Sequence, residues 1–167
     1  MIRLVATAQS RDAAELRRFF NRARNPGQGE RRKVGDAIAR GIGENFSAQR
    51  AGDGPPWAAL AERTVLERLA QGYPGREPIL RRSGRLRASY TQPGAADHVE
   101  EYETSGDGWS VAVGSRDSRA GILEDGGHTE DGSFVPPRPI SILNRRSRER
   151  IGTTLDFVFD QVLEVGR

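Results

Sequence analysis

The stretch that decides the fold, residues 57–90, reads WAALAERTVLERLAQGYPGREPILRRSGRLRASY. It starts with an aromatic and aliphatic segment at Trp57, continues through a turn rich in glycine and proline, and ends in an arginine-rich run at Tyr90. The stretch contains no plausible catalytic or metal-binding set. This layout is typical of a segment that packs, turns and contacts another protein, which points to assembly rather than to chemistry.

Two helices are expected within this stretch. Apolar residues recur at helical spacing and predict a helix over residues 61–70. The glycine- and proline-containing turn at 72–75 ends it. A further helix contains Leu86 and Tyr90, and Ser83 is its natural N-cap because a serine hydroxyl can accept a hydrogen bond from the first turn.

A longer helix is predicted upstream, over residues 29–48. Glycines at 35, 41 and 43 would weaken it by roughly 1 kcal/mol each relative to alanine, so close packing against another helix would explain them. Before this helix, the sequence predicts a short strand at 2–7 and a helix from Ser10 to about Asn25. The apolar face of the long helix repeats every four residues: Val34, Ile38, Ile42 and Phe46.

The middle of the chain changes to a strand period. Residues 99–104 and 109–114 predict two strands, joined by a hairpin turn at 105–108 that is rich in glycine. Trp109, with the valines two and four residues later, falls on one face. The first strand is acidic at residues 100, 101 and 103, which is typical of an exposed face or edge.

The C-terminal third combines irregular segments with a strong helical pattern. Ile122 and Leu123 predict one helical turn, residues 126–134 an exposed loop, and residues 136–139 a stiff extended segment. Apolar residues from Ile151 onward recur at spacings of three and four, which predicts a C-terminal helix of about twenty residues.

These elements define an α+β fold. We expect a small antiparallel sheet with several packed helices and a long C-terminal helix. The whole chain, residues 1–167, is predicted to form a single domain with extended loops near 50–56 and 115–139.

Composition limits the function. The hydrophobic fraction is 35%, so the core is modest and much surface remains for partners. The chain has no cysteine, which excludes disulfides, thiolate metal sites and a cysteine nucleophile. A net charge of +3 is too small to demand a nucleic-acid partner, although nearly all the cations are arginine and Lys33 is the only lysine. No apolar run approaches the roughly 18 residues of a membrane helix.

The two histidines are the only candidates for chemistry. His128 lies among acidic residues, but the two glycines before it break the helix that would align it with Glu124, so solvated loop charges are the favoured interpretation. His98 has no serine in a nucleophile-elbow motif near it. No phosphate-loop or dinucleotide motif is present, and we expect neither catalysis nor a cofactor.

Five segments together resemble the virion-morphogenesis (tail-completion) family of Mu-like and P2-like tailed phages. Residues 57–60 read WAAL, and residues 78–89 read PILRRSGRLRAS, which is similar to the family's basic, glycine-containing turn into a helix. Residues 113–115 (VGS), 120–127 (AGILEDGG) and 135–139 (VPPRP) are similar to its strand, its following helical segment and its Arg-Pro signature. The resemblance covers roughly residues 30–165.

The resemblance implies a small structural protein at the head–tail junction of a virion, without cofactor or catalysis. Such proteins assemble as rings of identical copies, for which we expect roughly six or twelve subunits. The implied partners are tail-tube, terminator or connector proteins, with DNA passing through the lumen, and the implied location is the virion after assembly in the host cytoplasm.

The sequence suggests five interface residues and leaves alternatives open. Trp57 and Leu86 are equally plausible as core residues. We expect Arg138 to anchor a carboxylate pair within or between subunits, because arginine forms bidentate pairs with carboxylates. A basic nucleic-acid-binding module is the alternative function, and a hydrolase using His98 or His128 is a third. The five interface candidates are Trp57, Arg85, Leu86, Gly126 and Arg138.

Overall fold

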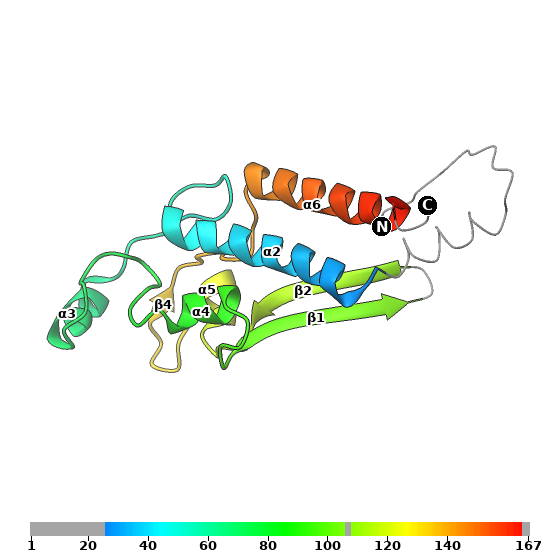
Figure 1. The fold of residues 1–167 in the computed structure, drawn as a ribbon. Helices are drawn as coiled ribbons and strands as arrows, with labels where there is room; N and C mark the ends of the chain where they lie inside the picture. Colours follow the sequence, from blue (N-terminus) through cyan, green and yellow to red (C-terminus); the bar gives the residue numbers. More distant parts are fainter. Residues whose placement is uncertain (1–25, 106–107, 165–167) are drawn as a thin grey trace, which may run out of the picture.

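The computed structural model describes residues 26–105 and 108–164, so the strand expected at 2–7 and the helix expected after Ser10 lie outside the described part. The long helix α2 (Gln28–Ala48) runs along the middle, with α6 (Arg145–Glu164) on one side and the β1–β2 hairpin on the other (Figure 1). Helix α4 (Arg85–Thr91) packs near the C-terminal end of α2, and α3 (Glu62–Ala70) lies apart from them. The α+β prediction is confirmed.

Helix α2 has the predicted limits to within one residue, and its four-residue apolar repeat forms the core as expected. Val34, Ile42 and Phe46 are buried, and Ile38 packs against the core. The helix ends at Gln49, which adopts a left-handed conformation and returns a backbone hydrogen bond to α2.

The core lies where α2, α4 and the segments between them meet. Phe46 is fully buried and contacts Trp57 edge-on at 5.8 Å and Tyr90 at 6.1 Å between ring centroids. Edge-to-face aromatic pairs of this kind contribute about 0.5–1.5 kcal/mol beyond the area they bury. The core cluster consists of Ile42, Phe46, Trp57, Ile79, Leu86, Tyr90, Ala120 and Ile140.

The three glycines of α2 each face a different element. A Cβ atom at Gly41 would lie 2.8 Å from Leu143 Cδ2 and 2.9 Å from Ser147 Cβ, so this glycine allows α6 to approach. Gly43 faces Thr91 of α4. Gly35 faces Glu100 of the hairpin. Close packing therefore explains all three glycines, but only Gly41 and Gly43 pack against a helix, as expected from the sequence.

We expect Gly41→Ala to destabilise the protein and Gly152→Ala to stabilise it, although both remove a glycine from a helix. At either position, replacing glycine by alanine stabilises the helix by about 1 kcal/mol, because alanine has the higher helix propensity. At Gly41 the added methyl group overpacks the α2–α6 contact, which costs about 1–3 kcal/mol, whereas nothing lies within 4 Å of it at Gly152. Urea unfolding measures both, and equal shifts of the same sign would contradict the packing argument.

The predicted hairpin is confirmed, with β1 (His98–Ser105) antiparallel to β2 (Gly108–Ser115). Trp109, Val111 and Val113 share one face, as expected, and pair with Thr104, Tyr102 and Glu100. This face is turned to α2, because Arg31 donates a hydrogen bond to Thr104 and Glu100 faces Gly35. The expectation of an exposed Glu100 is therefore wrong, while Glu101 and Glu103 are exposed.

Two local expectations need correction. Ser83 is not the N-cap of α4: Gly84 holds that position, at φ +81°, and the helix begins at Arg85. The hydroxyl of Ser83 accepts only a long hydrogen bond, of 3.5 Å, from Arg85 N. The segment 126–134 is not a simple loop, because β3 (Gly127–His128) pairs antiparallel with β4 (Phe134–Val135). The turn between them is held by hydrogen bonds among Thr129, Asp131 and Ser133, which the sequence pattern did not show.

The remaining helices agree with prediction in kind. The turn expected at Ile122 and Leu123 is the short helix α5 (Ala120–Asp125), and the C-terminal helix α6 begins at Arg145. Asn144 caps α6, since its side-chain oxygen accepts a hydrogen bond from Ser147 N. None of the helices within 26–105 and 108–164 is long and apolar enough to cross a membrane.

Candidate assembly interface

The structure places Trp57 and Leu86 in the core. Both are about 5% exposed, and the indole nitrogen of Trp57 donates a hydrogen bond to Pro139 O at 2.9 Å. Of the two roles that the sequence left open for them, these side chains have the core role, and they offer little surface to a partner. Arg85 is exposed and forms an ion pair with Asp97 at 2.7 Å, so its interface role stays a prediction.

Arg138 is buried but does not bind a carboxylate within the described residues. Its guanidinium donates to two backbone carbonyls, Ala58 O at 2.8 Å and Ala59 O at 3.0 Å. Burial, together with the nearby Arg68 cation, lowers the pKa of Arg138. The predicted carboxylate pair is therefore not formed within residues 26–105 and 108–164, where the guanidinium instead holds the segment after Trp57. A pair with a neighbouring subunit stays a prediction.

Arg138 belongs to a larger set of hydrogen bonds, which we call the clamp: Asn45, Arg138 and Glu124 with the backbone that they hold. Asn45 is 1% exposed and donates to both Ile140 O and Ile142 O at 2.7 Å. Its side-chain oxygen accepts from Gly52 N at 3.1 Å. One side chain thus joins α2 to the loop at 50–56 and to the segment before α6.

Glu124 forms the third part of the clamp. Its carboxylate accepts hydrogen bonds from Ile140 N at 2.7 Å and from both the backbone and the hydroxyl of Ser141. Glu124 lies in the last turn of α5 and joins that helix to the backbone that follows the Arg-Pro segment. Among the described residues, no group of three or more His, Asp or Glu side chains is arranged to hold a metal ion.

Gly126 has an internal reason to be glycine. It adopts φ +75°, and a Cβ atom there would lie 2.8 Å from Pro137 Cδ. The glycine therefore lets α5 end directly against the proline segment. A contact with another subunit at this position stays a prediction.

The two histidines are placed differently. The side chain of His98 is 6% exposed, and its Nδ1 lies 2.9 Å from Ser89 O, so it ties β1 to α4. His128 is exposed, and its ring lies 5.4 Å from the ring of Phe134. Among the residues that the structure describes, neither histidine forms a hydrogen bond to a side-chain hydroxyl, and His98 has a packing role.

Asp117 is a buried carboxylate that the sequence reasoning missed. The hydrogen bond from Arg119, opposed by burial, lowers the pKa of Asp117 to about 2. Asp117 also accepts a hydrogen bond from Arg119 N at 3.0 Å and leads into α5. Only its spacing two residues before an arginine could have indicated it, and that signal is weak.

We expect Asp117 to contribute stability that is lost in acid. Because its folded-state pKa lies below the unfolded value of about 4, the ionised group stabilises the fold above about pH 4, and this contribution disappears as the pH falls towards about 2. Arg119 is half exposed, so solvent screening reduces the effect to the order of 1 kcal/mol. Urea midpoints measured across this range should fall less steeply for Asp117→Asn than for the wild type, while Asp125→Asn, at an exposed site, should keep the wild-type slope.

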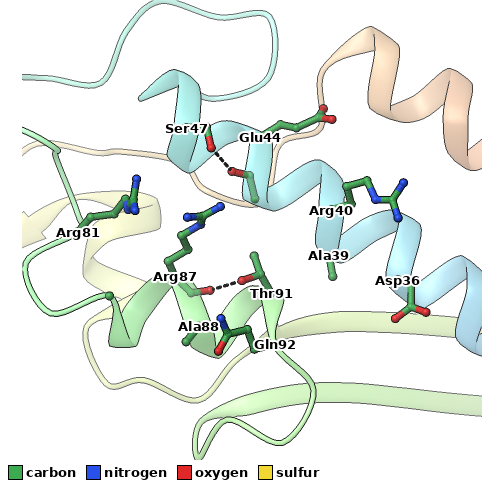
Figure 2. Close-up of a pocket in the computed structure, with 12 residues that line it drawn as sticks. Asp36, Ala39, Arg40, Glu44, Ser47, Arg81, Arg87, Ala88, Thr91 and Gln92 are labelled. Atoms are coloured by element: carbon green, nitrogen blue, oxygen red, sulfur yellow. Dashed lines mark hydrogen bonds between the residues drawn. The ribbon is translucent and has the colours of Figure 1, made fainter.

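A groove of about 720 Å³ lies between α2 and α4 (Figure 2). Small residues on the two helices, Ala39, Gly43 and Ala88, leave room for it. Figure 2 shows Arg87 extending from α4 towards the Ser47 end of α2, with Arg40 farther along α2. We call this feature the arginine groove. Its charged lining residues are Asp36, Arg40, Glu44, Arg81 and Arg87.

The arginine groove has an excess of unpaired positive charge. None of Arg40, Arg81 and Arg87 takes part in an ion pair within the portion of the chain that is described. Glu44 is already engaged by α6: burial opposes its ionisation, but hydrogen bonds from Ser147 and Arg150 outweigh that and lower its pKa. The groove is thus lined by three arginines, and Asp36 is its one carboxylate that forms no ion pair with a described residue.

A complementary acidic surface lies on the hairpin, on the face turned away from α2. Glu101 and Glu103 project there, opposite Ala112 and Ser110 on the paired strand. All four residues are exposed, and Glu101 makes only an exposed ion pair with Arg116 at 3.4 Å. We call this the acidic hairpin face. Its cross-strand neighbours are small, so the two carboxylates stand clear of the strand.

The fold and these surfaces define a small α+β protein whose buried polar groups hold its own backbone and whose charged surfaces remain open. The chain matches the model of the phage virion morphogenesis family over residues 12–156 and belongs to that family. No curated protein and no solved structure matches it significantly. The resemblance of the five motifs is thus confirmed, and the protein has a role in forming phage virions.

Proposed function

We propose that this chain is a structural protein at the head–tail junction of a tailed phage, where rings of identical copies complete the tail. Membership of the virion morphogenesis family supports the virion role. The ring, of roughly six or twelve copies, is the finer part of the proposal and would bind tail-tube, terminator or connector proteins through protein–protein contacts.

The observation that carries this proposal is the exposed apolar face of α3. Helix α3 stands apart from the other helices (Figure 1), and its Leu66 and Leu69 are 59% and 56% exposed. Residues three apart lie on one face of a helix, so the two leucines form a single surface. Exposed apolar patches on projecting elements are typical of contacts with another protein.

The structure also favours a structural role over a catalytic one. The buried side chains of Asn45 and Arg138, and the partly buried carboxylate of Glu124, are bound to backbone groups of the chain itself. Side chains used in this way stabilise the arrangement of segments and are not free to move protons or bind a substrate. The protein acts by presenting surfaces.

Light scattering on the purified protein, alone and mixed with the tail-tube protein of the same phage, tests the proposal. We expect a discrete oligomer or a complex with the tail protein. The double variant Leu66→Ser/Leu69→Ser should weaken the tail-protein complex without lowering the unfolding midpoint, while Glu67→Ser on the same helix should leave the complex intact. A monomer that binds no tail protein, or infectious particles completed without this chain, would overturn the proposal.

A further inference from the structure

We propose that the arginine groove of one copy binds the acidic hairpin face of the next copy, so that identical subunits associate head to tail. This inference rests on the proposed ring and names the contact that would build it. The groove supplies Arg40, Arg81 and Arg87, and the hairpin supplies Glu101 and Glu103.

The groove offers unneutralised positive charge to an external anion. Arg40, Arg81 and Arg87 line it, and none of them has a carboxylate partner among residues 26–105 and 108–164. Arginine presents a planar fork that binds carboxylates through two hydrogen bonds, so it is well suited to carboxylate side chains on another protein. The groove is open to solvent, and Arg40 is exposed.

The hairpin offers the matching charge in a suitable shape. Glu103 forms no ion pair within the described segments, and the ion pair of Glu101 with Arg116 is exposed at both ends and therefore weak. The side chains across the strand, Ala112 and Ser110, are small. A narrow two-stranded ribbon with protruding carboxylates can approach a groove between two helices more closely than a bulky surface could.

The same copy cannot make this contact with itself. The hairpin packs its other face on α2, through the contacts of Arg31 with Thr104 and of Glu100 with Gly35. The acidic hairpin face therefore points away from the helix that forms the groove. Two different, complementary surfaces on one chain make a heterologous contact, and such contacts close into rings when the rotation between copies allows it.

A second copy fits the groove better than a phosphate backbone does. Asp36 and Glu44 lie in the groove beside the arginines, and carboxylates at these positions repel phosphates. A neighbouring hairpin brings two separate carboxylates rather than a continuous line of charge, so it can meet the arginines and avoid Asp36. Nucleic acid is the alternative that the experiment distinguishes.

The test uses two charge-reversal variants of the full chain, Arg87→Glu and Glu103→Arg. Neither side chain takes part in a hydrogen bond or ion pair among the described residues, so both variants should fold. Each alone should raise the dissociation constant for self-association at least about tenfold, because like charges then face each other. An equimolar mixture should restore association, since every contact then joins either the two reversed residues or the two natural ones.

The mixture gives a result that a loss of stability could not give. An oligomer that forms only in the mixture must contain the two variants in alternation, so native mass spectrometry should show equal numbers of each variant in it. Arg146→Glu, at an exposed arginine outside the groove, should associate like the wild type. Single variants that associate normally, or a mixture that stays dissociated, would overturn the contact.

The outcomes separate this contact from the broader proposal. If the wild-type chain never self-associates, even with tail protein present, the proposed ring is wrong. If the wild type forms an oligomer and both variants associate as tightly as the wild type does, only the groove–hairpin contact is wrong. A duplex DNA fragment that binds the wild type but not Arg87→Glu, with association unchanged, would overturn the contact in favour of nucleic acid.

Discussion

Replacing Asn45 by alanine should lower the free energy of unfolding by about 4 kcal/mol, the largest effect that we expect from any single substitution in the clamp. The substitution leaves three backbone groups without their partner: the carbonyls of Ile140 and Ile142 and the N–H of Gly52. Each buried backbone group that loses its hydrogen bond costs about 1–3 kcal/mol. Chemical denaturation followed by tryptophan fluorescence measures the loss, because Trp57 lies in the adjacent core.

Ser47→Ala is the matched control for Asn45→Ala. It lies on the same helix and is exposed, and its hydroxyl only returns a local hydrogen bond to Gly43 O at 3.2 Å. We expect a change within about 0.5 kcal/mol. If Asn45→Ala were as mild as Ser47→Ala, the three hydrogen bonds of Asn45 would not be holding the two distant segments on α2.

Arg138→Met should destabilise the protein by about 2 kcal/mol. Methionine fills much of the space of the arginine stem but cannot donate to Ala58 O and Ala59 O. Hydrogen bonds from a charged donor contribute about 1.5–3 kcal/mol each, and removal of a buried cation near Arg68 offsets part of that loss. Thermal or urea unfolding measures the difference.

Two further variants separate the effect of the guanidinium geometry of Arg138 from the effect of removing an arginine elsewhere. Arg138→Lys keeps the charge but has no planar fork, so it should recover only part of the lost stability. Arg63→Met removes an arginine whose ion pairs, with Glu67 and Asp131, are exposed, and it should change stability by no more than about 0.5 kcal/mol. Full stability in Arg138→Met would show that the fork is dispensable and that the clamp depends on Asn45 and Glu124 alone.

The elements that could be predicted from sequence are those with a regular local period. The four-residue repeat from Val34 to Phe46 gave α2, and the alternation around Trp109 gave the hairpin with its inward face. Start and end signals were less reliable. The sequence favours Ser83 as the cap of α4, yet the left-handed Gly84 occupies the N-cap position, and Ser83 contributes only a long hydrogen bond of 3.5 Å from Arg85 N.

The candidate site was predictable only in part, for a physical reason. Asn45 and its carbonyl partners are 95 and 97 residues apart in sequence, and Arg138 and Ala58 are 80 apart. No local pattern encodes such pairs. A polar residue next to Phe46 on a helix with a buried face was the one available signal for Asn45.

The interface residues show the same limit. Trp57 and Leu86 are large apolar residues near turns, which suits a subunit contact and a core equally well, and tertiary packing placed them inside. The leucines of α3 were predicted as part of an ordinary helix, and only the position of α3 away from the other helices leaves them exposed. The arginine groove needs residues from α2 and from α4 together, so the runs of arginine in the sequence did not reveal it.

The residues that the clamp joins are far apart in sequence, so its hydrogen bonds can form only late in the synthesis of the chain. Asn45 leaves the ribosome long before Ile140 and Ile142, so the first half of the chain cannot close its central hydrogen bonds until nearly all of the polypeptide has emerged. Closing loops of this length also carries an entropic cost that slows folding. We therefore expect a chain that is terminated before residue 140 to lack the hydrogen bonds of Asn45 to this segment and to leave the Asn45 side chain without those partners.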